Sequence, residues 1–194
     1  MSDHSHSLPI FETKRLRLRE VQARDIESYT RNFVDFDVIR ELAAVVPWPY
    51  PPGGVATFVN TVIVPNQGKG SWVWGIFRKE DLNELIGVVH LQKEGRPENR
   101  GFWLARRFWG QGFMTEAVAP VMDYAFTELG FEKLVFANAV GNHRSRRVKE
   151  KTGARFVRTE PGTFVNPAYA EREIWELTRE EWAKWNGRSN ADAD

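Results

Sequence analysis

Arg107-Phe108-Trp109-Gly110-Gln111-Gly112 joins an expected strand, 101–104, to the longest expected helix, 111–129. Glycine accepts a left-handed backbone and lets a ligand approach without a Cβ in the way. A helix start presents free N–H groups and a partial positive charge, both of which suit a phosphate. The stretch therefore predicts either a plain turn or a phosphate-binding turn. It is neither a P-loop, which needs Gly-Lys-Ser/Thr, nor a dinucleotide fingerprint, whose third glycine is here Thr115.

A second junction of the same kind lies at Asn142-His-Arg-Ser145. An expected strand, 133–140, ends just before it, and an expected helix, 142–152, begins with Asn142 as its N-cap. Ser145 lies one turn into this helix, on the same face as Asn142 and Lys149. Asn142 and Ser145 are therefore either a cap and a surface hydroxyl, or two polar groups that contact a ligand.

The hydrophobic pattern of the rest of the sequence predicts further helices and strands before and after these two junctions. Alternating residues and turn signals predict strands, and periodic apolar residues predict helices. The expected order is strand, helices, three strands, helix, strand, helix and two strands, which indicates a mixed α/β or α+β single domain. The further strands are expected at 13–19, 72–78, 85–91, 156–158 and 173–177, and the further helices within 23–38, at 55–64 and from 178 to about 187.

Composition narrows the class of protein. The chain has 194 residues, of which 42% are hydrophobic, and this is an ordinary globular composition. Lys and Arg number 27 and Asp and Glu 26, so the chain lacks the basic excess of a dedicated nucleic-acid binder. Because it has no cysteine, disulfides, zinc–thiolate sites and thiol nucleophiles are excluded. Eight tryptophans predict a large aromatic core or pocket wall.

The charges are nevertheless unevenly spread. Residues 144–158 hold seven Lys and Arg against one Glu, and residues 159–194 are acidic on balance. The basic block is either a solvated helix face or part of a site for a phosphorylated ligand.

The two ends of the chain predict short tails around one domain. Residues 1–10 and 188–194 are expected to be disordered, and 11–187 to form the domain. The N-terminus lacks the basic stretch and apolar run of a signal peptide. The most apolar stretch, 45–64, is broken by prolines and glycines, so no membrane-spanning helix is expected. We therefore expect a cytoplasmic protein that does not associate with a membrane.

Together the two junctions resemble those of the GNAT superfamily of acetyl-coenzyme A-dependent N-acetyltransferases. Arg107, Gly110 and Gly112 match its R-x-x-G-x-G signature, and Asn142-x-x-Ser145 with a following Lys-x-Gly resembles its next element. Shorter stretches resemble the RimJ/RimL branch, which includes acetyltransferases of ribosomal-protein N-termini. These stretches are 13–19, 101–104, 109–112, 115–117 and 177–182.

The resemblance implies an α+β fold with a central, mostly antiparallel sheet flanked by helices. Two adjacent parallel strands, 101–104 and 133–140, would splay apart in mid-sheet, with coenzyme A between them. It also implies acetyl-CoA as cosubstrate and no metal. The implied cofactor-binding residues are Arg107, Phe108, Trp109, Gly110, Gln111, Gly112, Asn142 and Ser145.

The implied reaction is direct attack of a primary amine on the acetyl thioester. Ser145 is the candidate acid that protonates the leaving thiolate. Many relatives carry Glu where this chain has Asn99, and an amide cannot take a proton at neutral pH. His90 is the candidate base, because imidazole titrates near neutral pH, and a chain of waters is the alternative.

The sequence identifies the phosphate-binding residues and the acceptor less closely than the cofactor turn. Arg147 and Lys149, or Arg107, are candidates to pair with the coenzyme phosphates.

The acceptor is expected to be a protein N-terminus or a small amine, and a non-catalytic acyl-CoA sensing domain is the alternative. Nucleic-acid binding through 144–158 is disfavoured, and either a monomer or a homodimer is compatible. An acceptor pocket or the core would account for the aromatic residues Trp48, Tyr50, Trp72, Trp74, Trp103 and Trp109.

Overall fold

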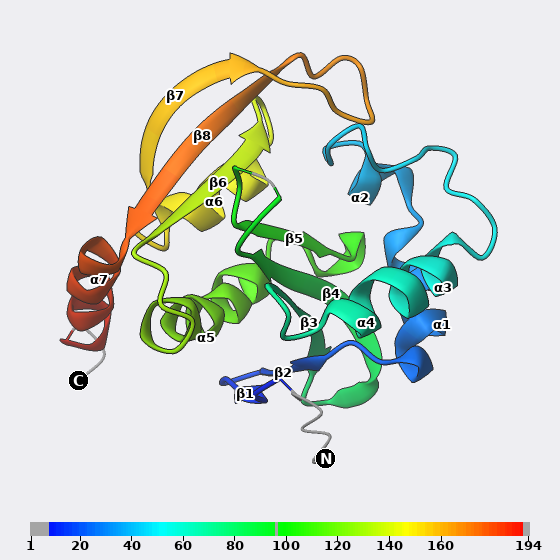
Figure 1. Ribbon diagram of the computed structural model, residues 1–194, viewed down its shortest axis with the longest axis horizontal. Coiled ribbons are helices and arrows are strands. Elements are labelled where there is room, and N and C mark those ends of the chain that lie inside the picture. Colours follow the sequence, from blue (N-terminus) through cyan, green and yellow to red (C-terminus); the bar gives the residue numbers. More distant parts are fainter. Residues whose placement is uncertain (1–7, 96, 192–194) are drawn as a thin grey trace.

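The computed structural model describes residues 8–95 and 97–191, with side chains described up to residue 187. Two antiparallel sheets lie beside one another and are flanked by helices (Figure 1). The first sheet contains, in spatial order, β1 (Phe11–Glu12), β2 (Leu16–Glu20), β3 (Ser71–Arg78), β4 (Asp81–Gln92) and β5 (Arg100–Leu104). The second contains β6 (Lys133–Ala139), β8 (Glu171–Thr178) and β7 (Arg155–Pro161). The expected α+β fold is confirmed.

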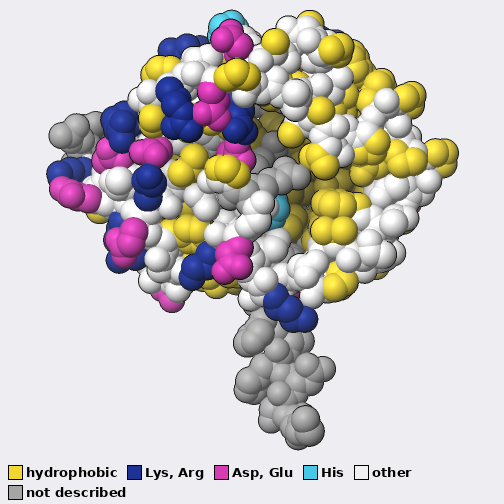
Figure 2. All heavy atoms as spheres, turned by 45° about the horizontal axis from the view of Figure 1, so that its top comes forward, with side chains coloured by type: hydrophobic (Ala, Val, Ile, Leu, Met, Phe, Trp, Pro, Cys, Tyr) yellow, Lys and Arg dark blue, Asp and Glu magenta, His cyan; other side chains and the backbone are white. Residues whose placement is uncertain are grey.

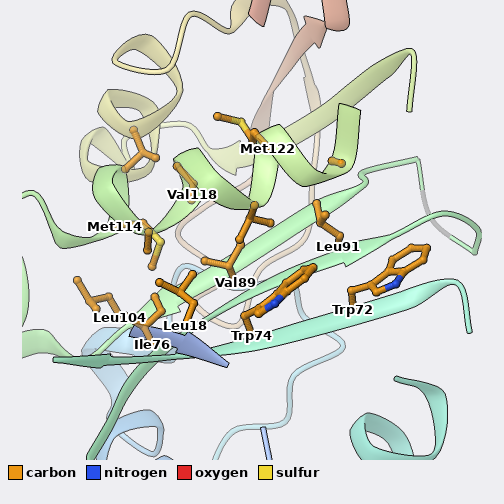
Figure 3. Packing of buried hydrophobic residues seen from close by; sticks show 14 of the residues in the cluster. Leu18, Trp72, Trp74, Ile76, Val89, Leu91, Leu104, Met114, Val118 and Met122 are labelled. Carbon is orange, nitrogen blue, oxygen red and sulfur yellow. The ribbon is translucent and has the colours of Figure 1, made fainter. Parts of the chain in front are cut away.

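Helices cover both faces of the first sheet. The core on one face includes residues of α5, among them Met114, Val118 and Met122, which pack over β3 and β4 (Figure 3). The core on the other face includes residues of α1 and α3. The helices are α1 (Ile26–Phe33), α2 (Phe36–Ile39), α3 (Gly54–Phe58), α4 (Val64–Asn66), α5 (Phe113–Thr127), α6 (His143–Glu150) and α7 (Arg179–Ala191), with a π-helical turn at Val59–Ile63 and 3-10 turns at Ala23–Asp25 and Arg106–Phe108.

The two sheets meet at the start of β5. The backbone N–H of Asn99 donates to the carbonyl of Val135 (2.9 Å), and the N–H of Val135 donates to Asn99 Oδ1 (2.9 Å). Beyond this junction, β5 and β6 are not paired with each other in the described part of the chain. Both run away from it in the same sense along one cavity, which confirms the expected splay. Far from the junction, Ala43 and Phe164 form an isolated bridge between two loops.

The domain boundaries differ from the sequence expectation. Leu8, expected in a tail, is buried in the core, and the carbonyl of Pro9 accepts a hydrogen bond from Trp74 Nε1 (3.0 Å). Helix α7 continues to Ala191, past the expected end near Gly187. Gly187 does not stop this helix because a glycine in a helix costs only about 1 kcal/mol. The rest of the expected tails, residues 1–7 and 192–194, lies outside the described residues. No helix within the described ranges has the length and apolarity to cross a membrane.

Candidate active site

A cavity of about 1200 Å³ follows the splay between the two sheets. Its volume exceeds the ~300–1,000 Å³ typical of small-molecule sites, so an extended ligand fits. Figure 2 shows a hollow with mainly hydrophobic side chains on one side and charged side chains on the other. The cavity is lined by β5, β6, the turn before α5, the start of α6, and the loops 41–47 and 161–164.

The turn before α5 forms a row of free backbone donors. Gly110 and Gly112 have φ of 74° and 79°, and Gly112 is the N-cap of α5. Within the described residues, the N–H groups from Gly110 to Thr115 have no hydrogen-bond acceptor. A Cβ placed on Gly110 would meet nothing within 4 Å, so the space beside the turn is open. This arrangement fits a phosphate group.

Not every residue of the turn lines the cavity. Phe108, Trp109, Gly110 and Gly112 do, as expected. Gln111 instead closes the turn, because its Nε2 donates to the carbonyl of Arg107 (3.0 Å).

Arg107 is the part of the signature that does not fit the expectation. Its side chain lies outside the cavity lining and forms an ion pair with Glu84. A phosphate contact through the Arg107 guanidinium would require this ion pair to break, so Arg107 stays a predicted contact that the observed geometry does not favour.

Helix α6 brings the polar residues of the second junction to the cavity. Asn142 Oδ1 accepts from the N–H of Ser145 (3.0 Å), so Asn142 is an N-cap, and both residues line the cavity. Arg147 and Lys151 line it too, and neither forms an ion pair in the described part of the chain. These two cations, one turn apart, are the ones available to a phosphate.

Other charges of the basic block are engaged elsewhere. Arg144 lies over the Trp109 ring (3.8 Å to the centroid) and pairs with Glu41 (2.8 Å). Arg146 pairs with Glu150 and Glu173. The block is thus neither a uniform solvated face nor a uniform phosphate site.

Lys149, one of the candidates for a phosphate contact, is buried against Ser145. Only 1% of Lys149 is exposed, and its Nζ donates to Ser145 Oγ (2.8 Å). Burial lowers the pKa of the Lys149 ammonium well below its usual value; the charge of Arg100 lowers it further, and Glu173 partly offsets this. The i, i+4 spacing of Ser145 and Lys149 was the sequence signal for this contact.

A second buried cation, Arg100, lies near the junction of the sheets and was not anticipated from the sequence. It is 5% exposed, its guanidinium lies over the Phe136 ring (3.9 Å), and Nη1 contacts Met122 Sδ (3.1 Å). Burial lowers the pKa of Arg100 to about 9.

The opposite wall of the cavity carries His90. It pairs with Gly101 across β4 and β5, and its Nε2 lies 2.9 Å from Ser71 Oγ. Neighbouring Trp103 and Tyr50 also line this wall, as does Trp109 at the turn. Trp72 and Trp74 are core residues, and Trp48 packs on Phe36, which divides the aromatic residues between pocket and core.

Asn99, at the position where the family resemblance implies Glu, has a structural role. It lies outside the cavity lining, and its side chain bonds to Val135 and to the carbonyl of Gln92 (3.3 Å). Glu98 lines the cavity instead and is paired with Arg172. No group of three or more His, Asp or Glu among the described residues is placed to hold a metal ion.

The family model described as "Acetyltransferase (GNAT) domain" matches residues 15–155 of the chain. The chain belongs to the GNAT acetyltransferase family. This match includes both glycines of the turn and the Asn142–Ser145 junction.

Relatives of this GNAT domain occur in bacteria and fungi. It is 31% identical over 111 residues to the Bacillus subtilis protein named "Putative ribosomal N-acetyltransferase YdaF", a match covering 56% of this chain and 60% of YdaF. It is 28% identical over 148 residues to the "Uncharacterized N-acetyltransferase YoaA" of the same organism, covering 75% and 82%. The chain thus spans less than two thirds of YdaF and most of YoaA.

Solved structures establish the fold of this GNAT domain independently. A ribosomal-protein-S5-alanine acetyltransferase from Vibrio fischeri superposes with a TM-score of 0.76 at 16% identity, covering 90% of this chain and 99% of that one. RimL, a ribosomal L7/L12 α-N-protein acetyltransferase in complex with coenzyme A, gives 0.73 at 17% identity, covering 88% and 98%.

Proposed function

We propose that this GNAT domain transfers an acetyl group from acetyl-CoA to a primary amine. The observation that carries the proposal is the row of free backbone N–H groups from Gly110 to Thr115, placed at one end of the cavity that Ser145 and His90 also line. The named activities of RimL and YdaF support it.

The coenzyme is expected to lie along the splay. Its pyrophosphate would accept from the amides at Gly110–Thr115, and Arg147 and Lys151 would add charge to that end. Its pantetheine would run along β5, which among the described residues is paired only with β4 beyond the junction at Asn99. The thioester would then reach the part of the cavity lined by Ser145.

Proton transfers complete the reaction. The amine nitrogen bonds to the acetyl carbon, the carbon–sulfur bond breaks, the amine loses a proton to a base and the sulfur gains one. Lys149 Nζ donates to Ser145 Oγ, so the hydroxyl hydrogen of Ser145 remains available for the sulfur. His90, on the opposite wall, is the candidate base.

Replacing His90 by Gln is expected to lower kcat/KM at pH 7 about 100-fold, because a positioned base contributes roughly 10²–10⁴-fold. The comparison variant is Glu98→Gln, because Glu98 precedes Asn99 and its side chain also lines the cavity. A large loss in Glu98→Gln with little change in His90→Gln would make Glu98 the base and His90 a structural residue.

Replacing Arg147 or Lys151 by Ala is expected to raise the Kd for coenzyme A roughly tenfold each, because each contributes a charge-assisted contact. The effect should shrink in 0.5 M salt as charges are screened. Isothermal calorimetry at two salt concentrations measures both. Arg155→Ala is the control, because Arg155 belongs to the same basic block but pairs with Glu176 outside the cavity. Equal losses in all three variants would mean only a general effect of net charge.

For the acceptor, we propose a protein N-terminus, as the names of the relatives suggest, and a small amine as the second candidate. The aromatic wall of Tyr29, Phe33, Tyr50 and Trp103 favours an apolar portion next to the amine. Thiol release from acetyl-CoA, measured with N-terminal peptides and with small amines, tests both. Tight coenzyme binding without turnover by any acceptor would support a sensing domain instead.

A further inference from the structure

We infer that Arg100 and Lys149 form a carboxylate-binding subsite at the closed end of the splay, and that this site takes, besides acetyl-CoA, acyl donors with a terminal carboxylate, as in a malonyl or succinyl thioester. The inference rests on the proposed function, since it assumes a coenzyme A thioester in the cavity. It extends the range of acyl groups beyond acetyl and leaves the reaction type unchanged.

The first observation is an unsatisfied buried guanidinium. Arg100 Nε and Nη2 are buried and have no hydrogen-bond partner in the described part of the chain. The faces of Phe136 and Phe102 attract the cation but accept none of its in-plane N–H bonds. Burying such donors without acceptors is costly, and arginine's planar fork matches the two oxygens of a carboxylate. The cost is offset when a carboxylate enters the cavity.

A second buried cation lies close by. Lys149 also lines the cavity, and Arg100 is near enough to lower the pKa of its ammonium. Neither side chain forms an ion pair within the described residues. The nearby carboxylate of Glu173 bonds to Asn138, Trp175 and Arg146 instead. Two buried like charges without a counterion repel each other, and an anion between them relieves that repulsion.

The position of the pair points to the acyl group. The phosphate-binding turn follows the far end of β5, at Leu104, whereas Arg100 begins that strand beside the junction at Asn99. A thioester that enters at the turn and runs along β5 therefore has its acyl end directed toward Arg100. Lys149, which holds Ser145, lies on the same path.

Arg100 and the candidate base His90 lie on opposite faces of the first sheet. Side chains alternate along β5, so Arg100 and Phe102 share the face covered by α5, and Lys149 Nζ lies 5.7 Å from the Phe102 ring centroid. His90 and Gly101 are opposite each other and belong to the other face, with Val88 and Trp103. The candidate base thus acts from the face opposite Arg100, which assigns the carboxylate to the donor.

The chemistry of transfer is unchanged by this assignment. The amine nitrogen bonds to the thioester carbon, the carbon–sulfur bond breaks, and one proton leaves the amine for the base. One proton passes from Ser145 to the sulfur, while Lys149 Nζ supplies one to Ser145 Oγ. The terminal carboxylate takes no part in bond making and remains ionised on the transferred chain.

The test compares succinyl-CoA with butyryl-CoA, which has the same chain length but no carboxylate. In the wild-type protein, kcat/KM is expected to be at least about tenfold higher for succinyl-CoA. In Arg100→Met, whose thioether fills the space beside Met122 and Phe136, the ratio of the two donors is expected to fall to about one. Taking the ratio within one variant cancels any general loss of activity, and Arg155→Met is the surface control.

The outcomes separate this inference from the proposed function. If free coenzyme A does not bind, the proposed function fails. If coenzyme A binds and acetyl is transferred, but succinyl-CoA has no advantage over butyryl-CoA, the carboxylate subsite is wrong. An advantage that survives in Arg100→Met also overturns it. If Arg100→Met instead removes a preference for acceptors with a free carboxylate over their amides, the subsite serves the acceptor and the assignment to the donor is wrong.

Discussion

Replacing Gly112 by valine is expected to raise the Kd for coenzyme A more than 100-fold. Gly112 has a φ of 79°, a left-handed conformation that a β-branched residue scarcely adopts, so the start of α5 must rearrange. Such a rearrangement moves the free N–H groups that follow Gly112 and disperses the anion site. A Cβ at this position meets only Arg15 Nη2, at 3.6 Å, so crowding within the protein does not explain the loss.

The matched control is Gly130→Val. Gly130 has a φ of 72° and follows α5 at its other end, and a Cβ at this position would meet nothing within 4 Å, so the backbone strain is comparable. Thermal melting should show similar destabilisation of both variants, whereas calorimetry should show lost affinity in Gly112→Val alone. Equal affinities for the two variants would contradict the assignment of the turn to the pyrophosphate.

Replacing Lys149 by methionine is expected to lower kcat about 100-fold while raising the melting temperature. The loss in rate follows because Ser145 loses the group that donates to its oxygen. The gain in stability follows because a buried cation without an ion pair is replaced by an apolar chain of similar length, a change worth about 1–4 kcal/mol. For a chain of this size, each kcal/mol corresponds to about 2–4 °C.

The pH dependence of Lys149→Met follows from the lowered pKa of the lysine. Below its usual value of 10.5, the unfolded chain binds a proton on Lys149 that the folded protein binds less readily. Wild-type stability should therefore rise with pH between the lowered pKa and 10.5, and the advantage of the variant should vanish above that window. The wild-type rate should fall as Lys149 deprotonates, and the variant should lack this limb. Ser145→Ala, which keeps the lysine, should lose rate without gaining stability.

An unchanged kcat in Lys149→Met, measured with saturating acetyl-CoA, would make Lys149 a structural residue only. A fall in stability would show that its contacts in the folded protein outweigh the cost of burying the charge.

The sequence predicted those features that depend on local chemistry. Gly110 and Gly112 form the expected turn because their φ values require glycine, and Asn142 caps α6 because its side chain reaches the N–H of Ser145. The order of strands and helices followed from periodicity in the same way.

Features that depend on residues far apart in the chain could not be predicted. Lys149 lies in a run of charges that is typical of an exposed face, and it is buried beside residues far away in the chain, among them Phe102 on β5. Arg107 matched a motif, but Glu84, on β4, determines where its guanidinium lies. The amide of Asn99 reads as a missing base in the sequence, whereas in the structure it bonds to Val135, 36 residues away.

That contact has a consequence for the alignment of the reacting groups. His90 belongs to one sheet, and Ser145 follows β6 of the other. The two candidates for proton transfer are therefore held by different sheets. Asn99 joins the two sheets at the narrow end of the cavity through its hydrogen bonds with Val135. An amide serves there because it donates and accepts at once, whereas a carboxylate in its place only accepts. The bonds between Asn99 and Val135 thus join the sheet that carries His90 to the sheet that Ser145 follows.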